Sequence, residues 1–305
     1  MSVESEWMQT LNMETGIVYA LVAGLFWGTS PVLVKRGLVN SDVSAATLFQ
    51  QGTILVTLIL FTFFEGNIFT GEISTLGLLI FIATGVVGAY LGRTLFVISV
   101  AQIGASRAQS LNNSSPLITV LLAWLLLGES LSLAIVGGVG LIISGVFFIT
   151  RAESPNHGAA APRSLTLASV LATICYGIVP VMKKFGTDHG GPPVLGALVM
   201  HATGLALLLT LGSLLKIELR WHRVPAGSLA CFVTAGVMQA IGSVLTLKAL
   251  VYAPASVVAP IWNTQPIVSF FLAKATLRGI EVVTFRDGIA AALVVVGVLV
   301  LRWGS

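Results

Sequence analysis

The chain has 305 residues, of which 56% are hydrophobic and only 9% are charged. Soluble domains carry about 25% charged residues, so this composition, with a mean hydropathy of +0.97, excludes a soluble globular protein and predicts an integral membrane protein. The formal net charge of +4 comes from basic residues spread along the chain, which argues against a nucleic-acid-binding surface.

The apolar segments, taken in chain order, predict ten membrane-spanning helices. A bilayer core about 30 Å thick needs roughly 20 apolar residues per helix. Residues 1–15 contain three glutamates and no Lys or Arg, so they lack the basic region of a cleaved signal peptide, and we expect the first apolar segment to be retained. The predicted helices span about residues 16–36, 44–64, 76–98, 105–127, 131–150, 165–185, 193–215, 227–249, 255–275 and 283–302.

Two motifs occur once in each half of the chain. Residues 27–37 and 176–186 are identical at five of eleven positions, and residues 105–116 and 255–266 at four of twelve. The polar segment 151–164 separates the copies, so we expect one five-helix repeat at 16–150, a linker at 151–164 and a second repeat at 165–302. Because five is odd, the second repeat would be inserted upside down. The predicted fold class is therefore all-α, with two inverted repeats of the kind found in carriers.

The first and sixth predicted helices each contain a proline followed by a lysine one turn later. Pro31 and Pro180 would serve as hinges. A lysine near a helix end can equally extend its ammonium group to the lipid headgroups, and that alternative stays open here. The candidate substrate contacts in these two helices are Trp27, Ser30, Lys35, Tyr176 and Lys184.

Polar residues cluster in the fourth and ninth predicted helices just before Pro116 and Pro266. Polar groups inside hydrocarbon are costly, and a proline frees a backbone carbonyl one turn earlier, so we predict a locally unwound lining of a central cavity, with both prolines as hinges. The alternative is hydrogen bonding between helices. The residues expected to face the cavity are Ser110, Asn113, Trp262, Asn263 and Gln265.

The third and eighth predicted helices add Tyr90, Arg93, Gln239 and Ser243 as candidate cavity residues. Gln50, Gln51 and His201 stand alone in apolar helices, and we expect His201 to be a hydrogen-bonded packing residue. No acidic residue falls in the interior of a predicted helix, because Glu129, Glu281 and Asp287 stand at helix ends. The cations Arg93, Lys35, Lys184 and Lys248 would then be unpaired, which favours a substrate that carries a carboxylate or another anionic group.

Pro116, the segment 126–129 (Leu-Leu-Gly-Glu) and a glycine-rich fifth helix that ends near Gly145 form a further pattern. With these motifs the chain resembles the drug/metabolite transporter superfamily, in particular its EamA-type permeases, over nearly its whole length. The resemblance implies that helices 1, 3, 4, 6, 8 and 9 line a central cavity. The second half departs from the pattern, because Arg278 and Gly279 stand where Gly128 and Glu129 stand in the first half.

We therefore expect a secondary carrier that moves a small polar metabolite, an amino acid or related compound, most often by export across the plasma (inner) membrane. The open alternatives are a passive, channel-like facilitator and a non-transporting membrane protein. Hydrolase, zinc-protease and P-loop signatures are absent, so we expect no enzymatic activity, no cofactor and no metal. Uniport, substrate exchange and proton coupling through His201 or a lysine all stay open.

Overall fold

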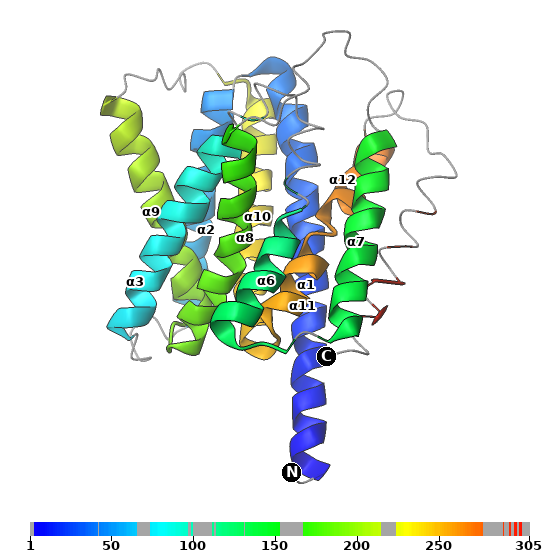
Figure 1. Ribbon diagram of the computed structural model, residues 1–305. Helices are drawn as coiled ribbons and strands as arrows, with labels where there is room; N and C mark the ends of the chain where they lie inside the picture. The colour runs from blue at the N-terminus through cyan, green and yellow to red at the C-terminus, as the bar shows by residue number, and fades with distance from the viewer. Residues whose placement is uncertain are drawn as a thin grey trace.

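The computed structural model describes residues 3–41, 43–65, 74–96, 114–130, 132–152, 167–214 and 224–276, together with residues 99 and 112 and six single positions between 289 and 300. Every regular element in these ranges is a helix, as predicted. The helices lie side by side in one bundle, and the first turns of α1 extend beyond it on the side of the N-terminus (Figure 1). The described part of the chain is therefore an all-α bundle.

The first half forms α1 (Val3–Gly37), the 3-10 turn η1 (Leu38–Asn40), α2 (Val43–Glu65), α3 (Thr75–Thr84), the π-helical segment η2 (Gly85–Gly92), α6 (Ser115–Leu127) and α7 (Leu133–Ala152). α1 begins earlier than the predicted residue 16, because residues 3–15 contain no proline or glycine that would end a helix. Glu14 consequently lies inside α1. The prediction that no acidic residue falls within a helix is wrong at this position.

The second half forms α8 (Leu167–Asp188), α9 (Pro193–Leu214), α10 (Ala226–Tyr252), α11 (Ala255–Trp262) and α12 (Gln265–Thr276). Within the described ranges, six helical stretches are long and apolar enough to cross a membrane: Leu11–Asn40, Ala45–Phe64, Thr75–Phe96, Leu167–Asp188, Pro193–Leu211 and Ala226–Tyr252. Most of the predicted linker and tenth helix, and the start of the fourth, lie outside those ranges. A total of ten helices therefore stays a prediction.

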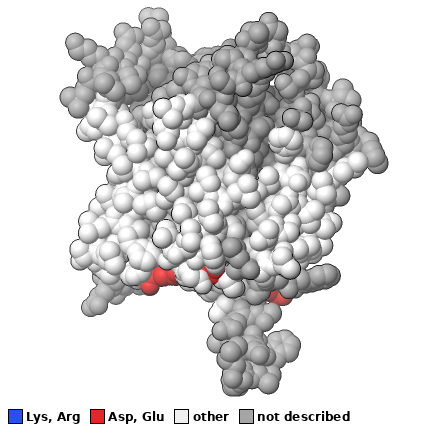
Figure 2. All heavy atoms as spheres, viewed as in Figure 1, with Lys and Arg blue, Asp and Glu red and all other residues white. Residues whose placement is uncertain are grey.

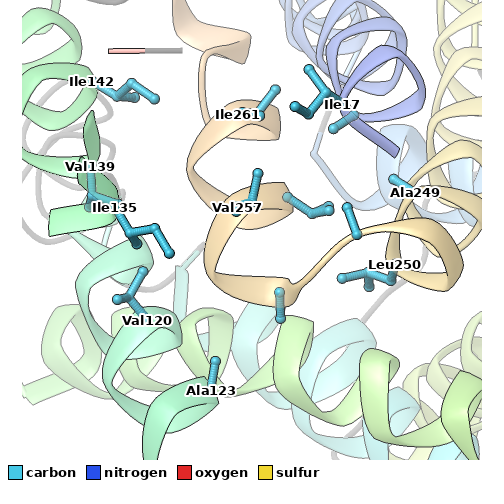
Figure 3. Close-up of a cluster of buried hydrophobic side chains, with 14 of the residues drawn as sticks. Ile17, Val120, Ala123, Ile135, Val139, Ile142, Ala249, Leu250, Val257 and Ile261 are labelled. Carbon is cyan, nitrogen blue, oxygen red and sulfur yellow. The ribbon is translucent and has the colours of Figure 1, made fainter. Parts of the chain in front are cut away.

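A cluster of buried apolar side chains joins the two halves. Figure 3 shows α11 at its centre, where Val257 and Ile261 lie between Val120 of α6 and Ile142 of α7 on one side and Leu250 of α10 on the other. Lipid tails are as apolar as these side chains, so the cluster stabilises the bundle through close packing more than through exclusion of water.

Contacts between the halves occur in equivalent pairs. The Ser269 hydroxyl of α12 donates to the Gly28 carbonyl of α1 at 2.6 Å, and the Thr119 hydroxyl of α6 donates to the Gly177 carbonyl of α8 at 2.8 Å. Gly28 and Gly177 occupy the same position of the repeated 27–37 motif, and Thr119 precedes Ser269 by 150 residues. Each half thus donates a hydroxyl hydrogen bond to the same glycine carbonyl position in the other half.

A second pair of equivalent contacts also joins the two halves. A methyl group at Gly37 of α1 would lie 2.5 Å from the Phe232 ring of α10, and one at Gly186 of α8 would lie 2.7 Å from the Phe81 ring of α3. Gly37 and Gly186 are again equivalent in the repeated motif. α1 and α8, which carry these glycines, run in opposite directions through the bundle (Figure 1).

Candidate functional site

The predicted ninth helix is interrupted inside the bundle (Figure 1). α11 ends at Trp262, Asn263 and Thr264 form a turn, and α12 begins at Gln265. Asn263 and Thr264 are buried, and the Asn263 amide donates to the carbonyl oxygen of Ala259 at 2.8 Å. The predicted unwinding of this helix is confirmed. Non-helical backbone at membrane depth occurs only inside protein or beside a water-filled cavity, so the break marks a candidate site.

One other described element departs from regular α-helix. α3 passes into the π-helical segment Gly85–Gly92 before Arg93. Single π-helical turns within α-helices are frequent at functional sites. The predicted cavity residues Ser110 and Asn113 lie outside the described residues, so their orientation stays a prediction.

The four predicted hinge prolines occupy two kinds of position. Pro116 and Pro266 stand in the first turn of α6 and α12, where a proline leaves no amide hydrogen bond unmade. Pro180 lies inside α8, which continues through it to its end, and Pro31 lies within α1. The described helix break therefore precedes Pro266, while the action of all four prolines as hinges stays a prediction.

A chain of hydrogen bonds links Arg93 to three other helices. The Arg93 Nη2 donates to Gln50 Oε1 at 2.7 Å, Gln50 Nε2 donates to Ser30 Oγ at 3.0 Å, and Ser30 Oγ donates to the Ala235 carbonyl at 3.2 Å. Gln50 and Ser30 are buried. The prediction that Gln50 stands alone is wrong, because it supplies an acceptor to the half-buried Arg93 guanidinium. Gln50 is neutral, so the lack of an acidic partner for Arg93 stays a prediction.

Lys183 is a buried cation that our reading of the sequence did not place in the site. Its side chain is 5% exposed, and its Nζ lies 5.0 Å from the centroid of the Trp262 ring. The neighbouring Lys184, which we predicted as an unpaired substrate contact, instead forms an ion pair with Asp188 at 2.8 Å. The sequence spacing could have predicted this ion pair, since Lys184 and Asp188 are four residues apart and such residues lie on the same face of a helix.

His201 of α9 joins this region to α10. Its Nε2 lies 2.9 Å from Ser243 Oγ, which confirms the hydrogen-bonded role and corrects the view that His201 is isolated. Its other ring nitrogen, Nδ1, is buried with no hydrogen-bond partner in the described part of the chain. His201 is thus a buried imidazole that makes one hydrogen bond in the described part of the chain.

The other predicted site residues have mostly structural contacts. The Trp27 Nε1 donates to Thr246 Oγ1 at 3.3 Å, and the Tyr176 ring meets Phe96 edge to face. The Lys35 side chain lies outside what the structure describes, and Lys248 is engaged by a neighbour, so neither supports the predicted set of unpaired cations. The remaining predicted residues are half-buried: Tyr90, Gln239 and Gln265.

Glu129 ties the first half of the chain to the start of α11. Its carboxylate accepts hydrogen bonds from the backbone N–H groups of Ala255 and Ser256, at 2.8 and 3.0 Å, and from the Ser256 hydroxyl at 2.5 Å. A carboxylate at a helix N-terminus is favoured both by the free N–H groups and by the helix dipole. Glu129 therefore anchors the element that leads to the break at Trp262.

The outer surface matches a lipid environment. On the face shown in Figure 2 the described atoms are uncharged over the height of the bundle, and carboxylates are visible only at one edge. Large apolar side chains are exposed, among them Phe64, Leu133 and Trp124. Within the described ranges no group of His, Cys, Asp or Glu side chains could hold a metal ion. The chain is a multi-pass membrane protein.

Both halves of the chain match the sequence pattern of the EamA-like transporter family, at residues 14–151 and 164–303. The uncharacterized inner membrane transporter YicL of Salmonella typhimurium (strain LT2) is 28% identical over 206 residues, which cover 63% of this chain and 65% of that protein. The aligned part thus spans less than two thirds of that relative. A solved crystal structure of a protein 18% identical to this chain superposes with a TM-score of 0.74 and covers 93% of this chain and 94% of its own, a likeness of fold.

Proposed function

Because the chain belongs to the EamA-like transporter family over both of its halves, we propose that it is a secondary carrier for a small polar metabolite, an amino acid or a related compound. It would act in an inner membrane, the location given in the name of the Salmonella relative. The proposed direction of transport is export. The match of both halves to one transporter family is the observation that carries this proposal.

We further propose that the chain forms ten helices in two inverted repeats. The reciprocal contacts of Gly28 with α12 and Gly177 with α6, and the opposite directions of α1 and α8 (Figure 1), support it. An exchange of equivalent contacts is what a two-fold relation between the halves produces, and opposite directions of equivalent helices are expected when its axis lies in the membrane plane. Such repeats can rock about a central site and expose it to either side in turn.

The central site of this proposal lies at the break between α11 and α12. Transporters of this kind bind substrate near the midplane, where discontinuous helices leave backbone groups free. Three residues lie at this break. α11 ends at Trp262, Asn263 follows it in the turn, and Lys183 contacts the Trp262 ring. Asn263→Ala is expected to lower transport about 10-fold, because an unpaired polar group costs about 1–3 kcal/mol.

Counterflow in proteoliposomes tests the carrier function. Vesicles that contain the purified chain are preloaded with one unlabelled amino acid and then exposed to a trace of the same compound in labelled form, for each proteinogenic amino acid in turn. A carrier takes up label faster when preloaded, because the loaded site returns across the membrane. Uptake without acceleration would identify a passive facilitator, and the absence of uptake for every compound would refute transport of amino acids. Empty vesicles and Asn263→Ala serve as controls.

A further inference from the structure

We propose that Lys183 and Trp262 form the subsite that binds the carboxylate of the transported metabolite. The inference rests on the carrier function proposed above and specifies the chemistry of its substrate. The sequence pointed to Arg93 and Lys184 as the cations that bind the anion, but Arg93 donates to Gln50 and Lys184 pairs with Asp188. Lys183 takes their place in this proposal, because among the described residues it has no hydrogen-bond acceptor and no carboxylate beside it.

Lys183 is short of hydrogen-bond acceptors. An ammonium group has three donors, yet within the described residues the Trp262 ring, 5.0 Å away, is the contact that its Nζ makes. An aromatic face attracts a cation but accepts no full hydrogen bond. The side chain is only 5% exposed, so the ammonium group lies inside the bundle. A bound carboxylate would supply the missing acceptors.

The acidic side chains that the structure describes are committed elsewhere. Asp188 pairs with Lys184, and both oxygens of Glu129 accept hydrogen bonds at the start of α11. Glu14 has a partner of its own near the beginning of α1. In the described part of the chain, none of these three carboxylates neutralises Lys183. Among the described groups no negative charge is left for Lys183, and an anionic ligand would supply one.

The internal repeat indicates that the fold itself does not require a cation here. Lys183 occupies the eighth position of the repeated motif, where the first half has Val34, whereas Lys184 corresponds to Lys35. The packing contacts of Gly28 and Gly177 are shared by both halves, but this charge is not. Lys183 is therefore a feature of one half, as expected for a residue kept for a ligand.

The neighbours of Lys183 also favour an anion. α12 begins three residues after Trp262, and a helix that starts inside the bundle directs the positive end of its dipole toward the break. Lys183 and this dipole together disfavour a cationic substrate and favour a carboxylate.

Matched pairs of probes test the proposal on the full-length purified protein. Acetate, propionate, L-alanine, L-leucine and L-phenylalanine are each compared with the corresponding carboxamide, by thermal shift for binding and by counterflow for transport. We expect at least one acid to raise the melting temperature in a concentration-dependent manner while its amide does not. Lys183→Met should weaken binding of that acid roughly 10- to 100-fold and leave any binding of the amide within about 2-fold.

Lys184→Met is the control, because it removes the same charge one residue away from the subsite; we expect it to change acid binding by less than about 3-fold. Without ligand, Lys183→Met should unfold at or above the wild-type temperature, because it removes a buried charge that lacks a counterion. If Lys183→Met fails to fold, Lys183→Arg, which retains the charge, should keep the preference for the acid.

The outcomes separate the two proposals. A wild-type protein in which no acid binds better than its amide, or a Lys183→Met variant that keeps the preference, overturns the subsite. Counterflow of neutral or cationic probes with no preference for the acid also overturns the subsite, and leaves the carrier function standing. Binding of an acid through Lys183 without any counterflow supports the subsite and refutes the carrier function.

Discussion

Replacing Glu129 by alanine is expected to destabilise the protein at the join between its two halves. The carboxylate accepts three hydrogen bonds from Ala255 and Ser256, the first two residues of α11. In the alanine variant both N–H groups and the Ser256 hydroxyl lose this acceptor. α11 carries the centre of the apolar cluster in Figure 3, so loosening its first turn affects α6, α7 and α10 together.

The expected magnitude follows from these contacts. Loss of an N-cap costs about 0.5–2 kcal/mol, and hydrogen bonds to a charged group contribute about 1.5–3 kcal/mol each when buried. Glu129 is half-buried, so we discount the sum and expect about 2–4 kcal/mol in the free energy of unfolding. For a chain of this size that corresponds to a fall of about 4–8 °C in melting temperature, measured on purified protein in detergent.

Two variants bracket this value. Glu129→Gln keeps one acceptor oxygen but loses the charge, so we expect about half of the effect. Ser130→Ala alters the exposed next residue and should leave the melting temperature unchanged. In a double-mutant cycle, Ser256→Ala should cost less in the Glu129→Ala background than in the wild type. A Glu129→Ala variant that melts within about 1 °C of the wild type would refute the anchoring role.

Three further changes test the packing and the hydrogen-bond chain. Gly28→Ala places a methyl group 2.5 Å from a backbone carbonyl of α12 and should cost about 1–3 kcal/mol, whereas Gly52→Ala, which faces open space, should melt like the wild type; equal melting temperatures would contradict the model of close contact. Gln50→Leu removes the acceptor of Arg93 and should cost about 1–3 kcal/mol, and adding Arg93→Leu should restore part of that loss in the same thermal assay. Gly128→Ala, at a φ of 68°, should cost about 1–2 kcal/mol, and a smaller loss is expected for Gly128→Asn; a neutral alanine variant would exclude backbone strain there.

Helix positions were predicted well where the sequence marks their ends. α2, α8, α9 and α10 begin and end within a few residues of the predicted limits, because charged residues, glycines and prolines stand at their ends. The contacts of Lys183 and Lys184 were not predicted. The ion pair of Lys184 with Asp188 depended on whether α8 ends at about residue 185 or continues to Asp188. The contact of Lys183 with Trp262 depended on the packing of α8 against α11.

Side-chain contacts between distant segments could not be predicted from a single sequence. Arg93 and Gln50 are 43 residues apart, and Glu129 and Ser256 are 127 apart, with no periodicity that relates one to the other. The duplicated motifs are the exception. They made Gly28 and Gly177 recognisable as equivalent positions, although the helices that each one contacts became evident only from the structure.

The reciprocal exchange of contacts bears on how the protein is made. Gly28 and Thr119 belong to the first half, and their partners Ser269 and Gly177 belong to the second. At a synthesis rate of about 5–20 residues per second, the roughly 150 residues from Thr119 to Ser269 take about 8–30 s to emerge. During that interval the first half stays in the bilayer with its glycine faces against lipid, a period in which an insertase or a second nascent copy could occupy them.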